Sequence, residues 1–447
     1  METGSQTSEV DIAEAPLPLT RGMVRRIVFS SSLGNALEWF DFLVYGYFAP
    51  LIAKQFFPVH DEWLSTLLAV GTFGISFLMR PLGAIVLGLY GDRKGRKAAL
   101  TLSIALMMAG TLAMAVMPPY ASIGLAAPLL ILLARLVQGF AVGGEFGSAT
   151  AFMVEHSSAK RGYYASWQFA SQGAAAILAA TFGGLLALWL PPAELAAWGW
   201  RVPFFFGLVL GPVGYYIRSH LDETPEFLAT RREKSRSETH APADEQAPRQ
   251  WLNLLLAVGI VAQSTVGVYI LQLYMPMYAV KQLHMAAATS FGVVVLNGGL
   301  QFALSPVMGA LSDRIGRVRI MLTTSILLAS LTYPMFAWLK THPTLGWLLL
   351  LQGAAGIFKA AYSGPMPALM SEIFPVRVRS TGLSIAYSLG VTLFGGFAPT
   401  IAELLIHWTG DTLAPAYYVA FAAVVSGLSL VVVGLRMRRP APVLTIA

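Results

Sequence analysis

Long apolar stretches constrain this chain more than any other feature. Several run for about 20 residues with almost no charge, which is the length that a helix needs to cross about 30 Å of hydrocarbon. Of the 447 residues, 56% are hydrophobic and 12% are charged, whereas a soluble domain carries roughly 25% charged residues. The runs lack the alternation of strands, and open sheets cannot span a bilayer. The sequence therefore predicts an all-α integral membrane protein.

Twelve apolar runs, bounded by proline, glycine and charge, define the predicted spans. They lie near residues 24–52, 63–90, 98–117, 122–154, 163–190, 200–219, 251–280, 286–311, 319–339, 345–371, 381–408 and 415–435. A long polar stretch divides them six and six, and the polar start of the chain lacks the pattern of a signal peptide. We therefore expect a disordered cytoplasmic tail over 1–20, a six-helix bundle over 21–220, a cytoplasmic linker over 221–250 and a second bundle over 251–440.

Basic residues sort by side of the predicted membrane. Of the 30 lysines and arginines, 23 fall on the side of the tail and the linker, four fall on the other side, and three lie within spans. Because basic residues stay cytoplasmic, this pattern predicts a multi-pass protein with both termini in the cytoplasm. The pattern also explains the net charge of +7 without any nucleic-acid partner.

The two halves repeat each other. "GLYGDRKGRK" over 88–97 follows the second span and "GALSDRIGRV" over 309–318 follows the eighth, so that Asp92 and Asp313 are equivalent positions. A glutamate–arginine pair also recurs at the ends of the fourth and tenth spans. Two motifs that recur at nearly the same offset predict two homologous six-helix bundles.

These motifs resemble those of a known transporter family. The repeated G-x-x-x-D-R-x-G-R pattern and "RLVQGFAVGGEFG" over 135–147 resemble signatures of the major facilitator superfamily. "LEWFDFLVYG" over 37–46 resembles the metabolite:proton symporter family, and the segments over 165–172 and 379–411 look most like citrate and tricarballylate carriers. The resemblance implies a bacterial inner-membrane protein whose two bundles rock about a central site, driven by proton uptake.

Two acids in the first span are the main candidates for proton coupling. Glu38 and Asp41 are three residues apart, so they share a helix face with Tyr45. A charge at bilayer depth costs roughly 2.5–3.5 kcal/mol on insertion scales unless it is paired or hydrated. In the family that the sequence resembles, this acid pair occurs in carriers of different substrates. We therefore expect proton coupling at Glu38 and Asp41, with Arg135 and Glu145. The alternative is that each acid is held in a structural ion pair.

Three deep cations, Arg80, Arg135 and Lys359, make an anionic substrate more plausible than a zwitterion or a sugar. Neutral hydrogen-bonding side chains at similar depth complete the expected site, although each alone is as well explained by a contact between helices. The expected substrate-binding residues are Tyr45, Arg80, Gln138, Gln168, Gln172, Lys359, Tyr362, Ser363 and Tyr387.

Charged residues cluster at the predicted cytoplasmic boundary. Similar clusters in the superfamily close the inner gate through ion pairs between helices, whereas the alternative is that the charges only set topology. The expected gate residues are Asp92, Arg93, Arg96, Glu155, Arg161, Asp313, Arg314, Arg317, Glu372 and Arg379.

A membrane enzyme and a channel are the alternatives of other classes. The chain has no cysteine, no GxSxG or HExxH motif and only scattered histidines, so we expect neither catalysis nor a metal site. The duplicated halves favour alternating access over a channel. The sequence predicts a monomeric, cofactor-free carrier that couples protons to citrate or a related tri- or dicarboxylate, with α-ketoglutarate, shikimate, betaine or proline as alternative substrates.

Overall fold

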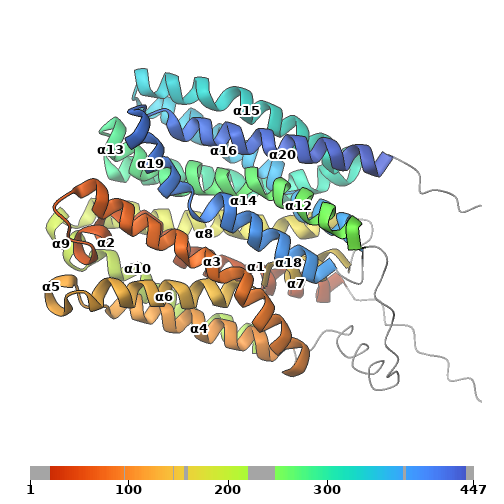
Figure 1. Ribbon diagram of the computed structural model, residues 1–447, viewed down its shortest axis with the longest axis horizontal. Helices are drawn as coiled ribbons and strands as arrows, with labels where there is room; N and C mark the ends of the chain where they lie inside the picture. Colours follow the sequence, from red (N-terminus) through yellow and green to blue (C-terminus); the bar gives the residue numbers. More distant parts are fainter. Residues whose placement is uncertain are drawn as a thin grey trace, which may run out of the picture.

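Within the described residues, helices form twelve successive segments close to the predicted spans. Figure 1 shows the computed structural model, in which these long helices lie side by side along one axis. It describes residues 21–94, 96–143, 145–155, 160–219, 247–375 and 379–438. Eight segments are long and apolar enough to cross a membrane, and two shorter apolar helices lie at Thr101–Val116 and Ala126–Val142.

The first half contains six of the segments. They are α1 (Arg21–Tyr47) with α2 (Ala49–Phe56), α3 (Glu62–Lys94), α4 (Arg96–Val116), α6 (Ala126–Val142) with α7 (Glu145–Glu155), α8 (Arg161–Trp189) and α10 (Val202–Ser219). Three short helices lie in the connections: α5 (Tyr120–Ile123), α9 (Pro192–Ala197) and η1 (Gly199–Arg201). They gather with α2 at one end of the bundle (Figure 1).

The second half contains the other six. They are α12 (Ala247–Val268) with η2 (Tyr269–Tyr274) and α13 (Met275–Leu283), α14 (Ala287–Ile315), α15 (Arg317–Thr341), α16 (Leu345–Ser363) with α17 (Met366–Ile373), α18 (Arg379–Gly390) with η4 (Val391–Gly396) and α19 (Ala398–Thr409), and α20 (Ala414–Arg438). We call the end where α14 meets α15 the motif end, and the end that carries α2 and α9 the opposite end.

Several segments change helix type or break part-way. The breaks lie next to prolines such as Pro50, Pro276 and Pro365, which lack the N–H that a continuous helix needs. In η2 and η4 the helix widens to π geometry, a feature that often marks functional sites. All six residues of η2 are buried, so this irregular backbone lies inside the protein, where a membrane protein can tolerate it.

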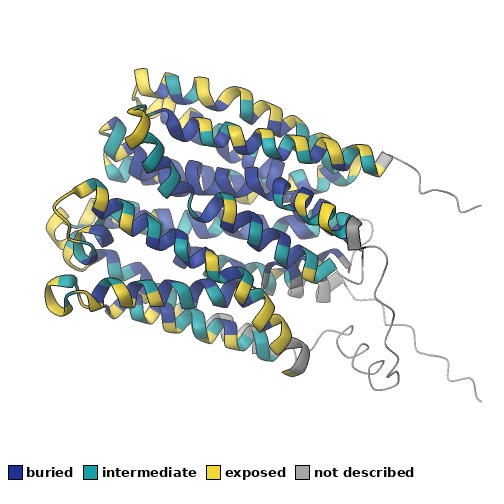
Figure 2. Ribbon diagram, in the orientation of Figure 1, coloured by how far each residue is buried: buried dark blue, intermediate teal, exposed yellow. Residues whose placement is uncertain are grey.

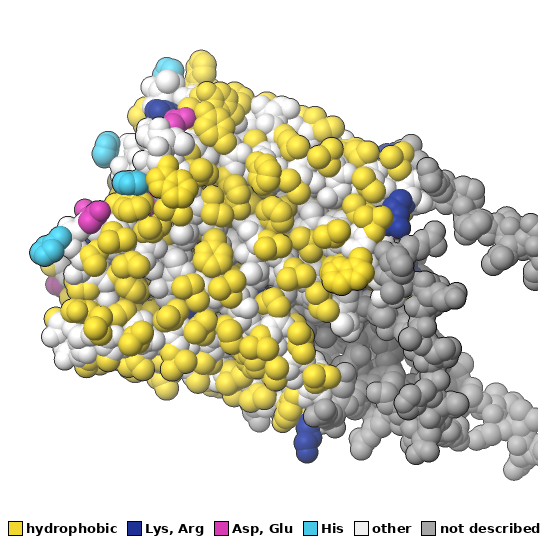
Figure 3. All heavy atoms as spheres, in the orientation of Figure 1, with side chains coloured by type: hydrophobic (Ala, Val, Ile, Leu, Met, Phe, Trp, Pro, Cys, Tyr) yellow, Lys and Arg dark blue, Asp and Glu magenta, His cyan; other side chains and the backbone are white. Residues whose placement is uncertain are grey.

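The outer surface of the bundle is apolar. Figure 2 shows buried residues along the inner faces of the helices and exposed residues along the outer faces. Exposed side chains include Leu188, Val209 and Leu255, and hydrophobic side chains cover most of the face seen in Figure 3, with charged side chains near its two ends. So large an apolar surface is what a surrounding lipid phase requires.

The two halves meet along several pairs of segments, among them α7 with α18. α8 packs along α14, and α3 packs against α18, η4 and α19. Two reciprocal glycine pairs bring α8 and α14 together: Gly162 with Gly309, and Gly173 with Gly298. An added Cβ on Gly298 would lie 2.9 Å from the Gly173 carbonyl oxygen, and one on Gly173 would lie 2.7 Å from the Gly298 carbonyl oxygen. Such close backbone approach is the role that small residues play between helices in membranes.

Candidate transport site

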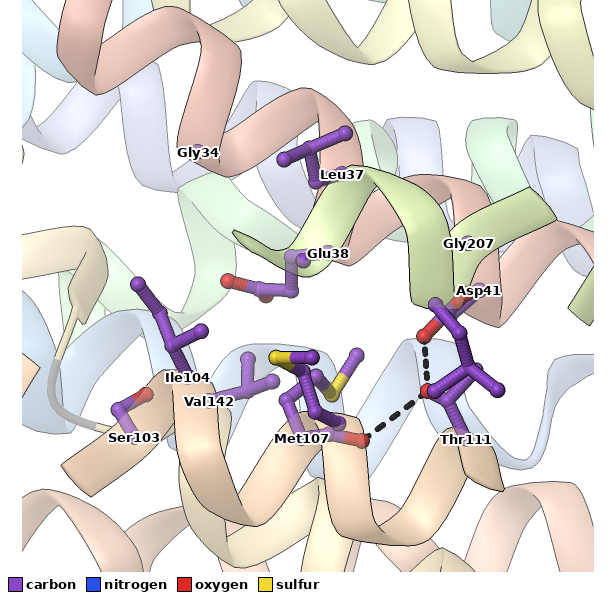
Figure 4. Close-up of a pocket in the computed structure, with 13 residues that line it drawn as sticks. Gly34, Leu37, Glu38, Asp41, Ser103, Ile104, Met107, Thr111, Val142 and Gly207 are labelled. Atoms are coloured by element: carbon purple, nitrogen blue, oxygen red, sulfur yellow. Dashed lines mark hydrogen bonds between the residues drawn. The ribbon is translucent and has the colours of Figure 1, made fainter. Parts of the chain in front are cut away.

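The two acids of α1 point into a small cavity within the first half. The cavity has a volume of about 60 Å³ and lies between α1, α4 and α10, which is room for a few water molecules. Figure 4 shows Glu38 and Asp41 on its wall, opposite side chains of α4. The acid pair therefore faces partner helices of its own half.

Asp41 is held tightly at one end of this cavity. Its side chain is 6% exposed, and its Oδ2 hydrogen-bonds the Thr111 hydroxyl of α4 (Figure 4). Its Oδ1 has no hydrogen-bond partner among the described residues. Gly207 of α10 lies so close that an added Cβ would be 2.6 Å from that oxygen. Glu38 is half-buried and has the more open position.

A chain of hydrogen bonds connects Asp41 with Arg135. The Arg135 Nη1 donates to Gln138 Oε1 at 2.8 Å, and Gln138 Nε2 donates to Thr111 Oγ1 at 3.1 Å. Thr111 then bonds Asp41, so four side chains from α6, α4 and α1 form one network. Two predicted proton-coupling residues, Asp41 and Arg135, are thus brought together through bridging side chains.

Arg135 and Arg80 lie over aromatic rings in the interior. The guanidinium carbon of Arg135 is 4.3 Å from the Tyr45 ring centre and 5.2 Å from that of Phe73, and that of Arg80 is 4.3 Å from the Phe77 ring centre. Arg135 is fully buried, and the Nε and Nη2 atoms of both arginines lack hydrogen-bond partners among the described residues. A buried donor without an acceptor costs free energy. The paired Nε and Nη2 donors of each guanidinium are therefore well suited to bind an anion.

An aromatic cluster lines the contact between α1, α3 and η2. Tyr269 of η2 stacks on Trp39 with ring centres 5.9 Å apart and meets the edges of Phe73 and Phe77 at 5.7 and 5.4 Å. Its buried hydroxyl has no hydrogen-bond partner within the described part of the chain. The π geometry of η2 thus places a polar group of the second half next to the arginines of the first.

Lys359 of α16 also contacts η2. Its ammonium hydrogen-bonds Gln272, whose side chain lies 3.5 Å from that of Gln301 in α14. Gln301 in turn donates to the Phe169 carbonyl of α8 at 2.9 Å. Lys359 therefore belongs to a polar network that reaches across the two halves, and it is 8% exposed.

Three of the predicted substrate-binding residues make contacts between helices. The Tyr45 hydroxyl donates to a backbone carbonyl of α3 at 3.1 Å, and the Tyr362 hydroxyl donates to one of α12 at 2.8 Å. The Ser363 hydroxyl pairs with that of Ser264 at 2.8 Å. These bonds hold α1 on α3 and α16 on α12.

The other predicted polar residues lie close to the junction of the halves. Gln168 accepts a hydrogen bond from Thr150 at 2.6 Å, within the first half. Tyr387 of α18 stacks on Phe146 of α7 with ring centres 3.5 Å apart, and Gln172 of α8 lies beside its hydroxyl. The stacked rings of Phe146 and Tyr387 thus join α7 of the first half to α18 of the second.

Comparison with known proteins decides the family. Residues 27–250 match the sugar (and other) transporter family, and residues 288–446 match the major facilitator superfamily. The citrate-proton symporter of Klebsiella pneumoniae is 38% identical over 392 residues, which cover 88% of this chain and 87% of that protein. The chain belongs to the major facilitator superfamily. It is therefore a membrane-spanning transporter with bacterial relatives, and the predicted resemblance and the predicted absence of enzymatic activity are confirmed.

Other relatives of the transporter carry different substrates. The proline/betaine transporter of Salmonella typhimurium is 35% identical over 423 residues, covering 92% of this chain and 84% of that protein. Among solved structures, the D-xylose-proton symporter has a TM-score of 0.72 at 17% identity, covering 91% of this chain and 97% of that one. The predicted fold, twelve transmembrane helices in two homologous bundles, is thereby confirmed.

At the motif end, a cluster of charged side chains in the second half contacts the start of α8. Arg317 pairs with Glu372 at 2.5 Å and with Asp313 at 2.9 Å. Asp313 also accepts hydrogen bonds from the backbone N–H groups of Gly162 and Tyr163, at 2.9 and 3.3 Å. The carboxylate of one half thus caps a helix of the other half, where the helix dipole favours negative charge.

The remaining predicted gate residues make other contacts, are exposed, or have side chains outside the described part. Arg161 lies within electrostatic range of Glu372, Arg379 donates to the Ser371 carbonyl at 2.9 Å, and Arg314 is exposed. The predicted residues whose side chains lie outside the described part are Asp92, Arg93, Arg96, Glu145 and Glu155.

Sequence reasoning missed several members of these networks. They are three residues that make bonds in these networks, Thr111, Gln272 and Gln301, and Tyr269, whose hydroxyl has no partner among the described residues. Gln272 and Gln301 could have been found because amides are rare in apolar spans. Thr111 gives no such signal, since a lone threonine in a membrane helix usually bonds its own backbone.

Proposed function

We propose that this transporter couples the uptake of protons to that of citrate or a related tri- or dicarboxylate. The proposal rests on the environment of Arg135. Arg135 is fully buried, it is connected to Asp41 by hydrogen bonds, and two of its three guanidinium nitrogens are unpartnered among the described residues. A single residue can thus respond both to a protonatable acid and to a carboxylate substrate.

Several further observations support an anionic substrate. Among the described residues, Arg80 has two unpartnered nitrogens near the same aromatic cluster, and Lys359 lies on the opposite half. The citrate-proton symporters of Klebsiella pneumoniae and Salmonella typhi are 38% and 39% identical to this chain. We infer that a carboxylate lies between Arg80, Arg135 and Lys359, with Gln172, Tyr269 and Tyr387 as neutral partners.

A betaine- or proline-type osmolyte is the second candidate substrate. Its support is the identity to proline/betaine transporters and the aromatic cluster around Tyr269 and Trp39, because aromatic faces attract quaternary ammonium groups. Against it, the guanidinium groups of Arg80 and Arg135 already lie over neighbouring rings. Competition between labelled citrate and unlabelled glycine betaine distinguishes the two candidates.

The topology and the gate belong to the same proposal. The motif end faces the cytoplasm, as do both termini, and the cluster of Asp313, Arg317 and Glu372 closes that end in one conformation and separates in another. Residues 21–220 and 251–440 form the two rocking bundles, joined by the linker over 221–250. A single chain is the functional unit.

Labelled citrate uptake into cells at pH 6 and pH 8, with and without a protonophore, tests the function. We expect uptake to be faster at pH 6 and abolished by the protonophore. Uptake that ignores both conditions would show that protons do not drive transport. Failure of every di- and tricarboxylate to compete would remove the anionic substrate.

Asp41→Asn tests the coupling acid. An amide of similar shape cannot release a proton, so we expect the variant to lose accumulation of citrate against its gradient while it still exchanges labelled for unlabelled citrate. Glu194→Gln is the matched control, because Glu194 is an exposed carboxylate of α9 outside the networks. Accumulation by Asp41→Asn at the unmodified level would move the coupling function to another residue.

A further inference from the structure

The hydrogen bonds between Arg135 and Asp41 have a direction. Arg135 donates to Gln138, Gln138 donates to Thr111, and Thr111 can donate to Asp41. When Asp41 is ionised, each donor points toward the carboxylate, so the chain runs from a cation to an anion. Hydrogen bonds aligned in this way polarise and strengthen one another. An ionised Asp41 therefore holds Arg135 through Gln138.

The Thr111 hydroxyl has a second acceptor within reach. Its Oγ1 lies 3.0 Å from the Met107 carbonyl oxygen, one turn earlier in α4 (Figure 4). A hydroxyl carries one proton, so it donates to Asp41 or to Met107 but not to both. A neutral Asp41 carries its own proton, donates it to Thr111, and leaves the Thr111 proton to Met107. Protonation therefore reverses the last bond of the chain without moving any backbone atom.

We propose that Thr111 and Gln138 form a relay through which protonation of Asp41 weakens the bond of Gln138 to Arg135 Nη1, the guanidinium nitrogen that the network holds, and so frees Arg135 for the carboxylate substrate. Thr111 is a positioning residue in this scheme, since it acts on Arg135 through Gln138. The only proton that leaves or enters the chain is that of Asp41, which exchanges with water in the cavity between α1, α4 and α10. The inference rests on the proposed function and assigns its coupling to two named side chains.

The surroundings of Asp41 fit this role. Among the described residues, the charged groups that face it are Glu38 on the same helix and Arg135 on α6, and Arg80 of α3 lies near Arg135. The residues that α4 and α10 contribute to the described cavity wall are not ionisable. Proton release to the cavity and substrate binding at Arg135 thus occur on opposite sides of the relay.

Thermodynamic linkage makes the proposal measurable. If protonation of Asp41 frees Arg135, then citrate bound to Arg135 must raise the proton affinity of Asp41 by the same factor. Citrate affinity should therefore increase as the pH falls, and it should do so only while the relay is intact.

Thr111→Val tests the relay, because valine keeps the shape of threonine and removes the hydroxyl. We expect its accumulation of citrate to fall about tenfold or more, in keeping with one lost hydrogen bond to a charged group, and its citrate affinity to become nearly independent of pH between 6 and 8. Exchange of labelled for unlabelled citrate should continue. Thr111→Ser retains the hydroxyl and should restore both accumulation and pH dependence.

Thr324→Val is the matched control. Thr324 is also buried in a membrane helix, and its hydroxyl bonds the carbonyl four residues earlier. We expect this variant to keep proton-driven accumulation. Gln138→Leu should reproduce the Thr111→Val phenotype, and the double variant should be no worse than either single one, because both cut the same chain.

Three outcomes separate this inference from the proposed function. If the unmodified transporter shows no proton-dependent citrate uptake, the proposed function fails. If the unmodified transporter shows that uptake and Thr111→Val retains it with the same pH dependence, the relay is wrong and the function stands. If Thr111→Ser fails together with Thr111→Val although both fold, the hydroxyl is not the active feature and the relay is also wrong.

Discussion

At the scale of single residues, the proposed site consists of buried polar atoms that lack hydrogen-bond partners among the described residues. Arg135 is fully buried with two unpartnered nitrogens in the described structure, and Tyr269 has an unpartnered hydroxyl nearby. Burying a donor without an acceptor costs about 1–3 kcal/mol, and more for a charged group. In the proposed function, the substrate supplies the missing acceptors.

Arg135→Lys tests whether a carboxylate substrate binds the Arg135 guanidinium, and it keeps the positive charge. Lysine presents a point charge and lacks the planar fork that matches a carboxylate, so we expect citrate affinity to fall by roughly 10–100-fold. The measurement is citrate binding to purified protein at pH 6. Arg201→Lys is the control, because Arg201 also lies on an aromatic ring and donates to a backbone carbonyl, but outside the site. Equal affinities for both variants would contradict a carboxylate at Arg135.

At the scale of elements, the contact between α8 and α14 depends on glycines. The pairs Gly162 with Gly309 and Gly173 with Gly298 place backbone against backbone at two levels of the same helix pair. This contact joins the two halves, so the proposed alternating access requires it to slide or pivot. Small residues allow that motion because no side chain interlocks across the seam.

Gly298→Leu and Gly299→Leu form a matched pair of substitutions on α14. A side chain at Gly298 meets the Gly173 carbonyl oxygen, whereas Gly299 faces open space. We expect Gly298→Leu to lower the thermal midpoint and abolish citrate transport, in keeping with about 1–3 kcal/mol for overpacking. Gly299→Leu should leave both unchanged. The measurements are thermal unfolding in detergent and citrate uptake in vesicles. Equal thermal midpoints and equal uptake for the two variants would show that transport does not depend on the close approach of α8 and α14.

At the scale of the whole molecule, the two halves are connected at both ends. At the motif end, Asp313 caps α8. At the opposite end, Lys281 of α13 donates to Thr66 of α3 at 3.0 Å, and the Trp63 ring stacks on His407 of α19 with ring centres 3.9 Å apart. Alternating access requires each set of contacts to break in turn, so locking either set should stop transport.

The absence of cysteine makes this test direct. Thr66→Cys with Lys281→Cys places two thiols across the halves, in a chain with no others. We expect a reversible bifunctional cross-linker to abolish citrate transport and a reductant to restore it. Asn253→Cys with Arg436→Cys is the control, because this hydrogen-bonded pair lies within the second half. Full transport by the cross-linked Thr66–Lys281 variant would rule out separation of the halves at that end.

Local patterns predicted the architecture well. Hydrophobic length placed the segments. The breaks next to Pro50, Pro276 and Pro365 are seen only in the structure. The repeated motifs predicted two halves, and the comparisons confirmed the family and the fold. The predicted domain boundaries and the roles of individual site residues stay predictions.

The partners of the buried side chains could not be predicted in the same way. The sequence predicts Asp41 as a proton-coupling residue. Its bridge to Arg135 through Thr111 and Gln138 depends on the rotation of α1, α4 and α6 against one another. Tyr362 and Ser363 look like site residues in the sequence and make helix contacts in the structure.

The sequence by itself determined that this protein crosses a membrane as two repeated helical halves, because the cost of polar groups in hydrocarbon acts on each span separately. Only the tertiary structure decided which acid meets which base. A hydrogen bond depends on fractions of an ångström and on side-chain rotamers, and these arise from packing between residues far apart in the chain. The relay from Asp41 to Arg135 through Thr111 is the clearest example.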